Sequence, residues 1–145
     1  MRAWLIRALS LVALHVLVRT GLAWALRSGP AAETALRFTA IALLVAVVLV
    51  WAGLDAVRDD PADPSRPDLL VRWSATALLV GPVAGFFGWA LQSWLVDASG
   101  AERLGVELTG GAAFTVLLVL LPGVLGVALG RRIAPAGDRN GSRAG

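Results

Sequence analysis

The stretch that decides the fold is TAIALLVAVVLVWAGL (39–54), which carries no charged side chain. It is the centre of an apolar run from about 35 to 57, and comparable runs cover about 3–26, 69–96 and 110–130. Runs of about 18 or more apolar residues are typical of transmembrane helices, because a helix rises ~1.5 Å per residue and the hydrocarbon core is ~30 Å thick. The sequence therefore predicts an all-α membrane protein, a bundle of four transmembrane helices with short loops.

The overall composition agrees with this prediction. Of 145 residues, 57% are hydrophobic and 16% are charged, whereas about 25% are charged in an average soluble domain. The four apolar runs leave little chain for a soluble domain, and the polar segment 131–145 has the composition of a disordered tail. The net charge of +3 does not indicate a nucleic-acid partner, because the arginines cluster at the ends of apolar runs. The expected partner is the lipid bilayer.

The distribution of arginine predicts the orientation in the membrane. If the N-terminus is cytoplasmic, nine arginines lie on the cytoplasmic side (2, 7, 58, 66, 72, 131, 132, 139 and 143) and three outside (27, 37 and 103). This excess follows the positive-inside rule, and the tryptophans fall near the expected interfaces. The chain has arginine and one histidine but no lysine, and it is rich in Ala, Gly, Val and Leu. This composition favours a bacterial source. We therefore expect a multi-pass protein of the bacterial inner membrane with both termini cytoplasmic.

A cleaved signal peptide is the alternative interpretation of the N-terminus. MRAWLIR (1–7) resembles a charged n-region, and Ala23-Trp24-Ala25 resembles a cleavage site. However, Arg19 interrupts the apolar stretch that a signal peptide would keep uncharged. The sequence favours a retained transmembrane helix.

His15 and Arg19 lie four residues apart, and hence on one face of the first helix. Ionisable residues inside membranes are costly and often mark solute pathways. Alternatively, Arg19 reaches the outer interface with its long side chain and His15 is hydrogen-bonded to a neighbouring helix. Both interpretations are open at this stage.

The expected topology places several polar residues at a similar depth, in the outer third of the membrane. These residues are Arg19, Thr20, Thr39, Gln92, Ser93 and Thr115. With His15, which lies deeper on the same helix face as Arg19, the candidate substrate-binding residues are His15, Arg19, Thr20, Gln92 and Thr115. No carboxylate lies at this depth in the sequence, so an arginine among hydroxyl and amide groups favours an anion or a water-filled vestibule.

Glycine and proline interrupt the third and fourth runs. The residues are Gly81, Pro82, Gly85 and Gly88 in the third, and Pro122, Gly123, Gly126 and Gly130 in the fourth. The pairs 81/85 and 126/130 have GxxxG spacing, which allows close helix approach. We expect the third and fourth helices to pack through them, and the prolines to provide hinges if the protein transports.

The remaining chemistry-bearing residues argue against an enzyme. One histidine and no cysteine exclude multi-histidine and thiolate metal sites, and no serine has an evident base–acid pair. We expect no catalytic residues, no metal and no cofactor. Asp55 lies three residues before Arg58 and is expected to pair with it, and the acids of the loop that follows are expected to be solvated.

Four segments carry a family resemblance: MRAWLIRAL (1–9), VWAGLDAVRD (50–59), VRW (71–73) and AAFTVLLVLLPGVLGVALGR (112–131). Together they resemble an actinobacterial four-transmembrane family of the drug/metabolite transporter superfamily. The resemblance implies an oligomeric transporter of a small metabolite or drug. Small multidrug transporters of that superfamily carry a glutamate in the middle of their first helix, where this chain has no carboxylate. A neutral or anionic solute therefore suits this chain better than a cationic drug.

Two classes of function stay open. A transporter accounts for the polar residues in the membrane, and the family resemblance favours it. A structural or accessory membrane subunit would instead use the glycine-rich faces to dock onto itself or onto a larger complex.

Overall fold

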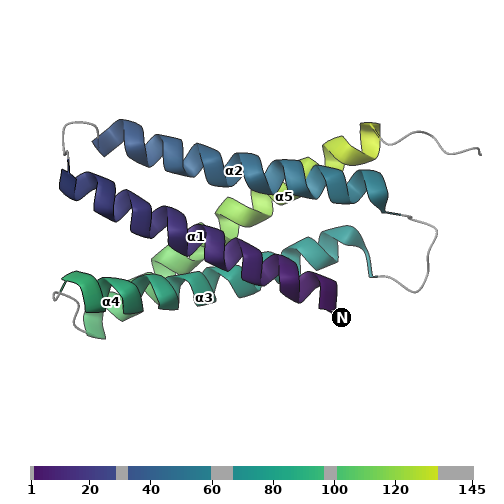
Figure 1. Ribbon diagram of the computed structural model, residues 1–145. Helices are drawn as coiled ribbons and strands as arrows, with labels where there is room; N and C mark the ends of the chain where they lie inside the picture. Colours follow the sequence, from purple (N-terminus) through teal and green to yellow (C-terminus); the bar gives the residue numbers. More distant parts are fainter. Residues whose placement is uncertain (1, 29–32, 60–66, 97–100, 134–145) are drawn as a thin grey trace, which may run out of the picture.

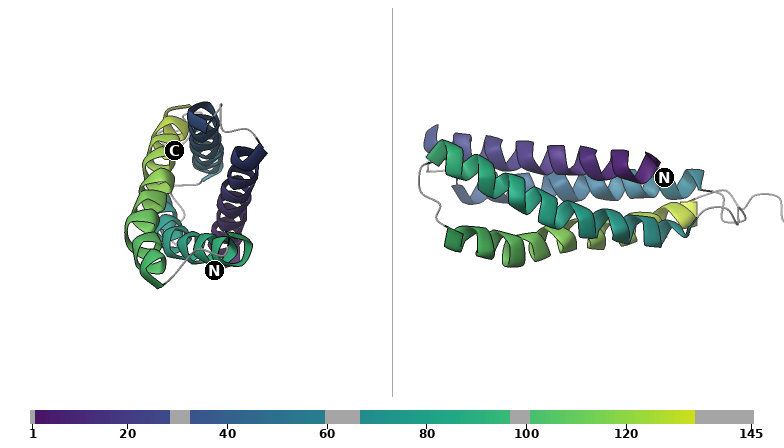
Figure 2. Two further views of the ribbon diagram at one scale, coloured as in Figure 1. Left: turned by 90° about the vertical axis from the view of Figure 1, so that its left-hand side faces the viewer. Right: turned by 90° about the horizontal axis from the view of Figure 1, so that it is seen from below.

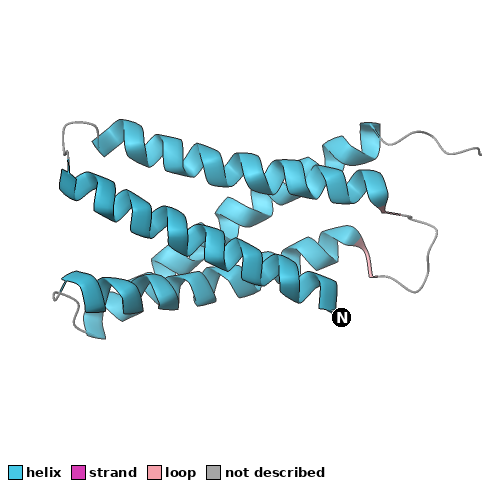
Figure 3. Ribbon diagram, viewed as in Figure 1, coloured by secondary structure: helices cyan, strands magenta, loops and turns pink. Residues whose placement is uncertain are grey.

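The computed structural model describes residues 2–28, 33–59, 67–96 and 101–133, and all of them except Asp59, Pro67 and Asp68 are helical (Figure 3). In chain order the elements are α1 (Arg2–Ser28), α2 (Glu33–Arg58), α3 (Leu69–Val96), α4 (Ala101–Val106), the π-helical η2 (Glu107–Gly111) and α5 (Ala112–Ile133) (Figure 1). Four stretches are long and apolar enough to cross a membrane: Trp4–Leu26, Glu33–Arg58, Leu69–Leu91 and Leu104–Ile133. The predicted all-α fold with four transmembrane helices is confirmed.

The four long helices are not equally packed against one another. α5 makes its most extensive contacts with α2 and also packs on α3, whereas α3 packs on α1. Contacts between α1 and α2 are sparse. Seen along the bundle, the order of neighbours is α1, α3, α5 and α2 (Figure 2). The α1–α2 side is therefore the loosely joined side of the bundle.

Many of the buried side chains are small, although Trp73 and Leu69 are also buried, and many large apolar side chains face outward. In α3 the buried apolar residues recur every three or four positions, as Leu69, Trp73, Ala77, Val80 and Ala84. The outward residues include Leu17 and Phe38, each 69% exposed. This pattern suits a lipid environment, because helices associate there through close contact of small residues rather than by removing apolar surface from water.

The fourth membrane segment begins earlier than the sequence suggested. Residues 101–109 were expected to belong to a connecting loop, but α4 starts at Ala101 and continues through η2 into α5. The Thr109 hydroxyl donates to the carbonyl of Gly105 at 2.8 Å, which satisfies a backbone group near the π-helical turn. Charged residues mark the end of the apolar run, not the end of the helix, because water can solvate their side chains while the backbone stays helical. α5 also continues to Ile133, so the first residues of the expected tail are helical, and 134–145 lie outside the described residues.

The GxxxG pair Gly126/Gly130 was expected to pack against α3, but it packs against α2. A Cβ on Gly126 would lie 2.4 Å from the carbonyl oxygen of Leu49, and one on Gly130 would lie 2.3 Å from that of Gly53. These separations are far below van der Waals contact, so only glycine allows the two backbones to approach this closely. The expectation missed Gly53, Ala52 and Ala56 of α2, which provide the complementary small face.

The other glycines and the prolines of α3 and α5 lie in different surroundings. Gly81 faces α5 as expected, where a Cβ would lie 2.7 Å from the carbonyl oxygen of Ala112. Gly123 makes room for the indole of Trp73, which is buried in the core rather than exposed at a lipid interface. Gly85 is buried, Pro82 is exposed and Pro122 is buried, and both prolines lie within continuous helices. Their proposed role as hinges stays a prediction.

Candidate functional site: a polar pocket in the membrane bundle

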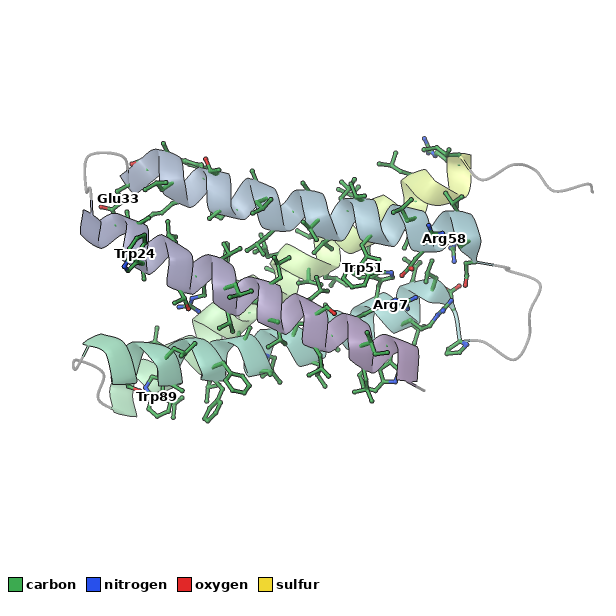
Figure 4. The ribbon with its side chains drawn as sticks, in the orientation of Figure 1. Arg7, Trp24, Glu33, Trp51, Arg58 and Trp89 are labelled. Carbon is green, nitrogen blue, oxygen red and sulfur yellow. The ribbon has the colours of Figure 1, made fainter. Side chains whose placement is uncertain are left out.

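A pocket of about 480 Å³ lies between α1, α2 and the η2–α5 segment. Its lining combines polar and apolar side chains from all three: His15, Val18, Arg19, Leu22, Ala23, Leu26, Arg37, Ala40, Ile41, Leu44, Gly111, Phe114, Thr115 and Leu118. Pockets of 300–1,000 Å³ are the usual size for small-molecule sites. We call the end of the bundle that contains Trp24, Glu33 and Trp89 the pocket end (Figure 4).

His15 and Thr115 form the buried, innermost polar contact of this pocket. His15 is 6% exposed, and its Nε2 lies 3.3 Å from Oγ1 of Thr115. The single hydroxyl proton of Thr115 is donated to the carbonyl of Gly111 at 2.9 Å. With this proton donated to Gly111, the hydroxyl oxygen accepts from the His15 tautomer that is protonated on Nε2, so the direction of this contact depends on the tautomer. Two candidates that are 100 residues apart in the chain are thus joined directly.

Arg19 lies one helical turn, ~6 Å, closer to the pocket end than His15. Its guanidinium covers Gly88 of α3: a Cβ at that position would lie 3.0 Å from Nη1, 3.2 Å from Cζ and 3.5 Å from Nε. The similar distances to all three atoms show that the flat face of the group lies over the glycine. Gly88 was expected to serve helix packing alone, but it also provides space for a pocket-lining arginine.

Arg37 is a pocket residue that the sequence interpretation missed. It was counted only as an outer arginine in the topology, although it shares a face with Ile41 and Leu44 of the lining. Its Nη2 lies 2.6 Å from Oε1 of Glu33, one turn earlier in α2, and both side chains are about half exposed. The spacing 37, 41, 44 was the signal that could have placed Arg37 on this face.

The predicted polar layer is only partly assembled. Thr20 is half-buried but is not among the lining residues, and Thr39 is exposed. Gln92 lies in α3, and its side chain is outside the described structure. The structure therefore brings together His15, Arg19 and Thr115, and it adds Arg37 to them.

The opposite end of the bundle is held by ion pairs, and we call it the ion-pair end. Arg7 Nε of α1 lies 3.0 Å from Oδ2 of Asp55 of α2, with side chains 15% and 13% exposed. The expected partner of Asp55 was Arg58, which is also at this end (Figure 4). A spacing of three residues allowed that local pair, but the packing of α1 beside the end of α2 places Arg7 against the carboxylate.

Two more ion pairs join other segments at this end. Arg72 of α3 donates to Asp59, which directly follows α2, so this acid is not simply solvated as expected. Arg131 of α5 lies 3.3 Å from Asp68, the residue that precedes α3, and both side chains are about half exposed. Together with Arg7–Asp55, these pairs connect all four long helices.

Asp68 also caps α3, and this makes a pH dependence predictable. Its Oδ1 accepts from the backbone N–H of Leu70 at 2.7 Å. This bond, aided by Arg131, lowers the pKa of Asp68 below its ordinary value of 3.8. The ionised Asp68 carboxylate therefore contributes fully to the stability of the fold above its ordinary pKa. This contribution is lost as the pH falls through the lowered pKa.

We expect acidification from about pH 6 to about pH 3 to lower the unfolding midpoint in detergent more for the native chain than for Asp68→Asn. The asparagine still caps the helix but does not titrate there. Equal losses in the two proteins would contradict this role of Asp68.

Comparison with known proteins gives no match among protein-family models or curated proteins. The family resemblance of the sequence therefore stays a prediction. The helices and their lipid-suited faces define the chain as a multi-pass, all-α membrane protein.

Proposed function

We propose that this chain is a small transporter of the drug/metabolite type and that its solute binds in the pocket between α1, α2 and α5. The observation that carries the proposal is the pocket itself: about 480 Å³ lined by two arginines, a histidine and a threonine within membrane-spanning helices. Ionisable groups in the membrane are costly, and they are found where solutes or ions pass.

The orientation we propose follows from the arginine distribution. Nine arginines on one side against three on the other would place the ion-pair end and both termini in the cytoplasm of a bacterium. The pocket end then faces outward. The resemblance to four-transmembrane transporters of the drug/metabolite superfamily supports the same assignment.

The two ends of the bundle differ in a way that suits transport. Ion pairs connect the helices at the ion-pair end, and α1 and α2, which both line the pocket, make few contacts with each other. Alternating access would require the ion pairs to separate when the pocket end closes. Since four helices enclose little space for a complete path, we propose that the working unit is a homo-oligomer.

A structural or accessory subunit is the alternative, and the glycine contacts weigh against it. That alternative relies on glycine faces that dock onto a partner. Gly81, Gly126 and Gly130 are instead occupied by contacts within this chain. A purely structural role also leaves the polar pocket without a purpose.

Cysteine accessibility tests the proposal, and the native chain has no cysteine that would interfere. Val18→Cys lines the pocket, Leu17→Cys beside it faces lipid, and Thr34→Cys is an exposed control at the start of α2. A maleimide that cannot cross membranes reacts with the thiolate, which forms in water and not in lipid. We expect reagent added outside cells to label Val18→Cys at least about tenfold faster than Leu17→Cys.

Each departure from this pattern has a definite meaning. If Val18→Cys is as slow as Leu17→Cys while Thr34→Cys is labelled, the pocket is dry and the transporter proposal is wrong. If Val18→Cys reacts from the cytoplasmic side alone, the proposed orientation is reversed.

A further inference from the structure

We infer that the pocket between α1, α2 and α5 takes uncharged, lipid-soluble molecules and binds them through a hydrocarbon body. This inference rests on the proposed function, because it assigns a solute class to the same pocket. It excludes two other classes that a membrane pocket with arginines could take, namely anions and cationic amphiphiles.

Most of the pocket surface is apolar. Ten of the fourteen lining residues have no polar side-chain atom, and they include Leu22 of α1, Leu44 of α2 and Phe114 of α5. Water in contact with such walls is held poorly, because the walls offer it no hydrogen bonds. A hydrocarbon body that fills part of the 480 Å³ removes these walls from water, which favours binding.

The polar side chains of the lining already have partners within the chain. Nε2 of His15 lies 3.3 Å from the hydroxyl oxygen of Thr115, and this hydroxyl donates its proton to the carbonyl of Gly111. Arg19 is engaged as well, and its guanidinium lies over Gly88. A polar group on the solute would have to displace an existing partner, and the exchange of one hydrogen bond for another contributes little to affinity. Affinity therefore comes from the apolar walls.

The charges at the pocket favour neither an anion nor a cation. Nη2 of Arg37 lies 2.6 Å from Oε1 of Glu33, so these two side chains together carry no net charge. An anion placed on Arg37 would also meet the Glu33 carboxylate, whose like charge repels it. The described lining has no carboxylate to attract a cation, and its two arginines repel one. An uncharged solute meets neither penalty.

Protection of Val18→Cys against the impermeant maleimide measures this selectivity in proteoliposomes. Three probes share an octyl chain and are compared at equal mole fractions in the bilayer: octanol is uncharged, octanesulfonate anionic and octyltrimethylammonium cationic. We expect octanol to slow the labelling of Val18→Cys saturably by about fivefold or more, because it displaces loosely held water, and the charged probes to change it by less than about twofold. Thr34→Cys reports general effects of the probes on the bilayer.

Two leucine variants in the Val18→Cys background connect the protection to the pocket. Ala40→Leu in α2 adds bulk to the lining, whereas Ala42→Leu adds the same bulk two residues later at an exposed position. We expect Ala40→Leu to raise the octanol concentration for half-maximal protection about tenfold or more, because the added methylene groups occupy the space of the solute. Ala42→Leu should leave this concentration unchanged.

Glu33→Gln tests whether the charge pair excludes anions. This variant removes the carboxylate that accompanies Arg37 and leaves the guanidinium in the pocket. We therefore expect octanesulfonate, which does not protect the parent, to protect Val18→Cys in Glu33→Gln. If it still gives no protection, pairing with Glu33 is not what excludes anions, and the charge argument is wrong.

The outcomes separate the inference from the function on which it rests. If Val18→Cys is labelled but either charged probe protects it as well as octanol does, the solute class is wrong and the transporter proposal stands. If octanol protects Ala40→Leu as well as its parent, octanol acts outside the pocket and the inference is overturned. If Val18→Cys is not labelled at all, the transporter proposal itself fails.

Discussion

Replacement of Asp55 by alanine is expected to destabilise the bundle by about 3 kcal/mol or more, since it leaves a charged, nearly buried Arg7 without its carboxylate. The Arg7–Asp55 contact is 3.0 Å long, and both side chains are at most 15% exposed. Removing one member of a buried pair costs more than the pair contributes, because the other charge has already left water. The midpoint of unfolding by a denaturing detergent, followed by tryptophan fluorescence, measures the loss.

Two variants show whether the buried charge is the cause. Arg131→Ala breaks the exposed pair with Asp68 and should cost no more than about 1 kcal/mol. The double variant Arg7→Met with Asp55→Leu removes both charges and should recover most of the stability lost in Asp55→Ala. If the double variant is as unstable as the single one, packing and not charge accounts for the loss.

Gly130→Ala is expected to cost about 2–3 kcal/mol, at the upper end of the usual range for overpacking. The added Cβ would lie 2.3 Å from the carbonyl oxygen of Gly53 and 2.7 Å from the Cβ of Ala56. Neither is the mobile end of a long side chain, so α2 and α5 must move apart. Because this is the most extensive helix contact of the bundle, the shift weakens the whole interface.

Gly21→Ala provides the matched control, since a Cβ on Gly21 in α1 would meet no atom within 4 Å. Alanine favours a helix over glycine by up to about 1 kcal/mol, so this variant should be neutral or slightly more stable. The same detergent titration applies to both proteins. If Gly130→Ala behaves like Gly21→Ala, the close approach of α2 and α5 is not required for stability.

The fold was predictable because the membrane restricts the choices of the backbone. A chain in hydrocarbon must satisfy its N–H and C=O groups internally, and an apolar run such as 39–54 can do so only as a helix. The helical segment that starts at Ala101 was missed, since hydropathy reports the polarity of side chains and not the hydrogen bonding of the backbone.

The candidate site was only partly predictable. Depth along the chain placed Arg19 and Thr115 in one layer and His15 nearer the middle of the membrane, whereas the structure joins His15 directly to Thr115 at 3.3 Å. Depth does not determine which way a helix is rotated, so Thr20 was included although it does not line the pocket. Arg37 was left out for the same reason.

The sequence by itself determined that the chain is an all-α, four-helix membrane protein, because apolar length is a local property of each segment. Only the tertiary structure decided which residues contact one another across the helices. It paired Asp55 with Arg7 instead of Arg58, and it packed Gly126 and Gly130 against α2 instead of α3. These partners depend on helix order and rotation, which arise from contacts between residues far apart in the chain and leave no mark on the hydropathy of any single segment.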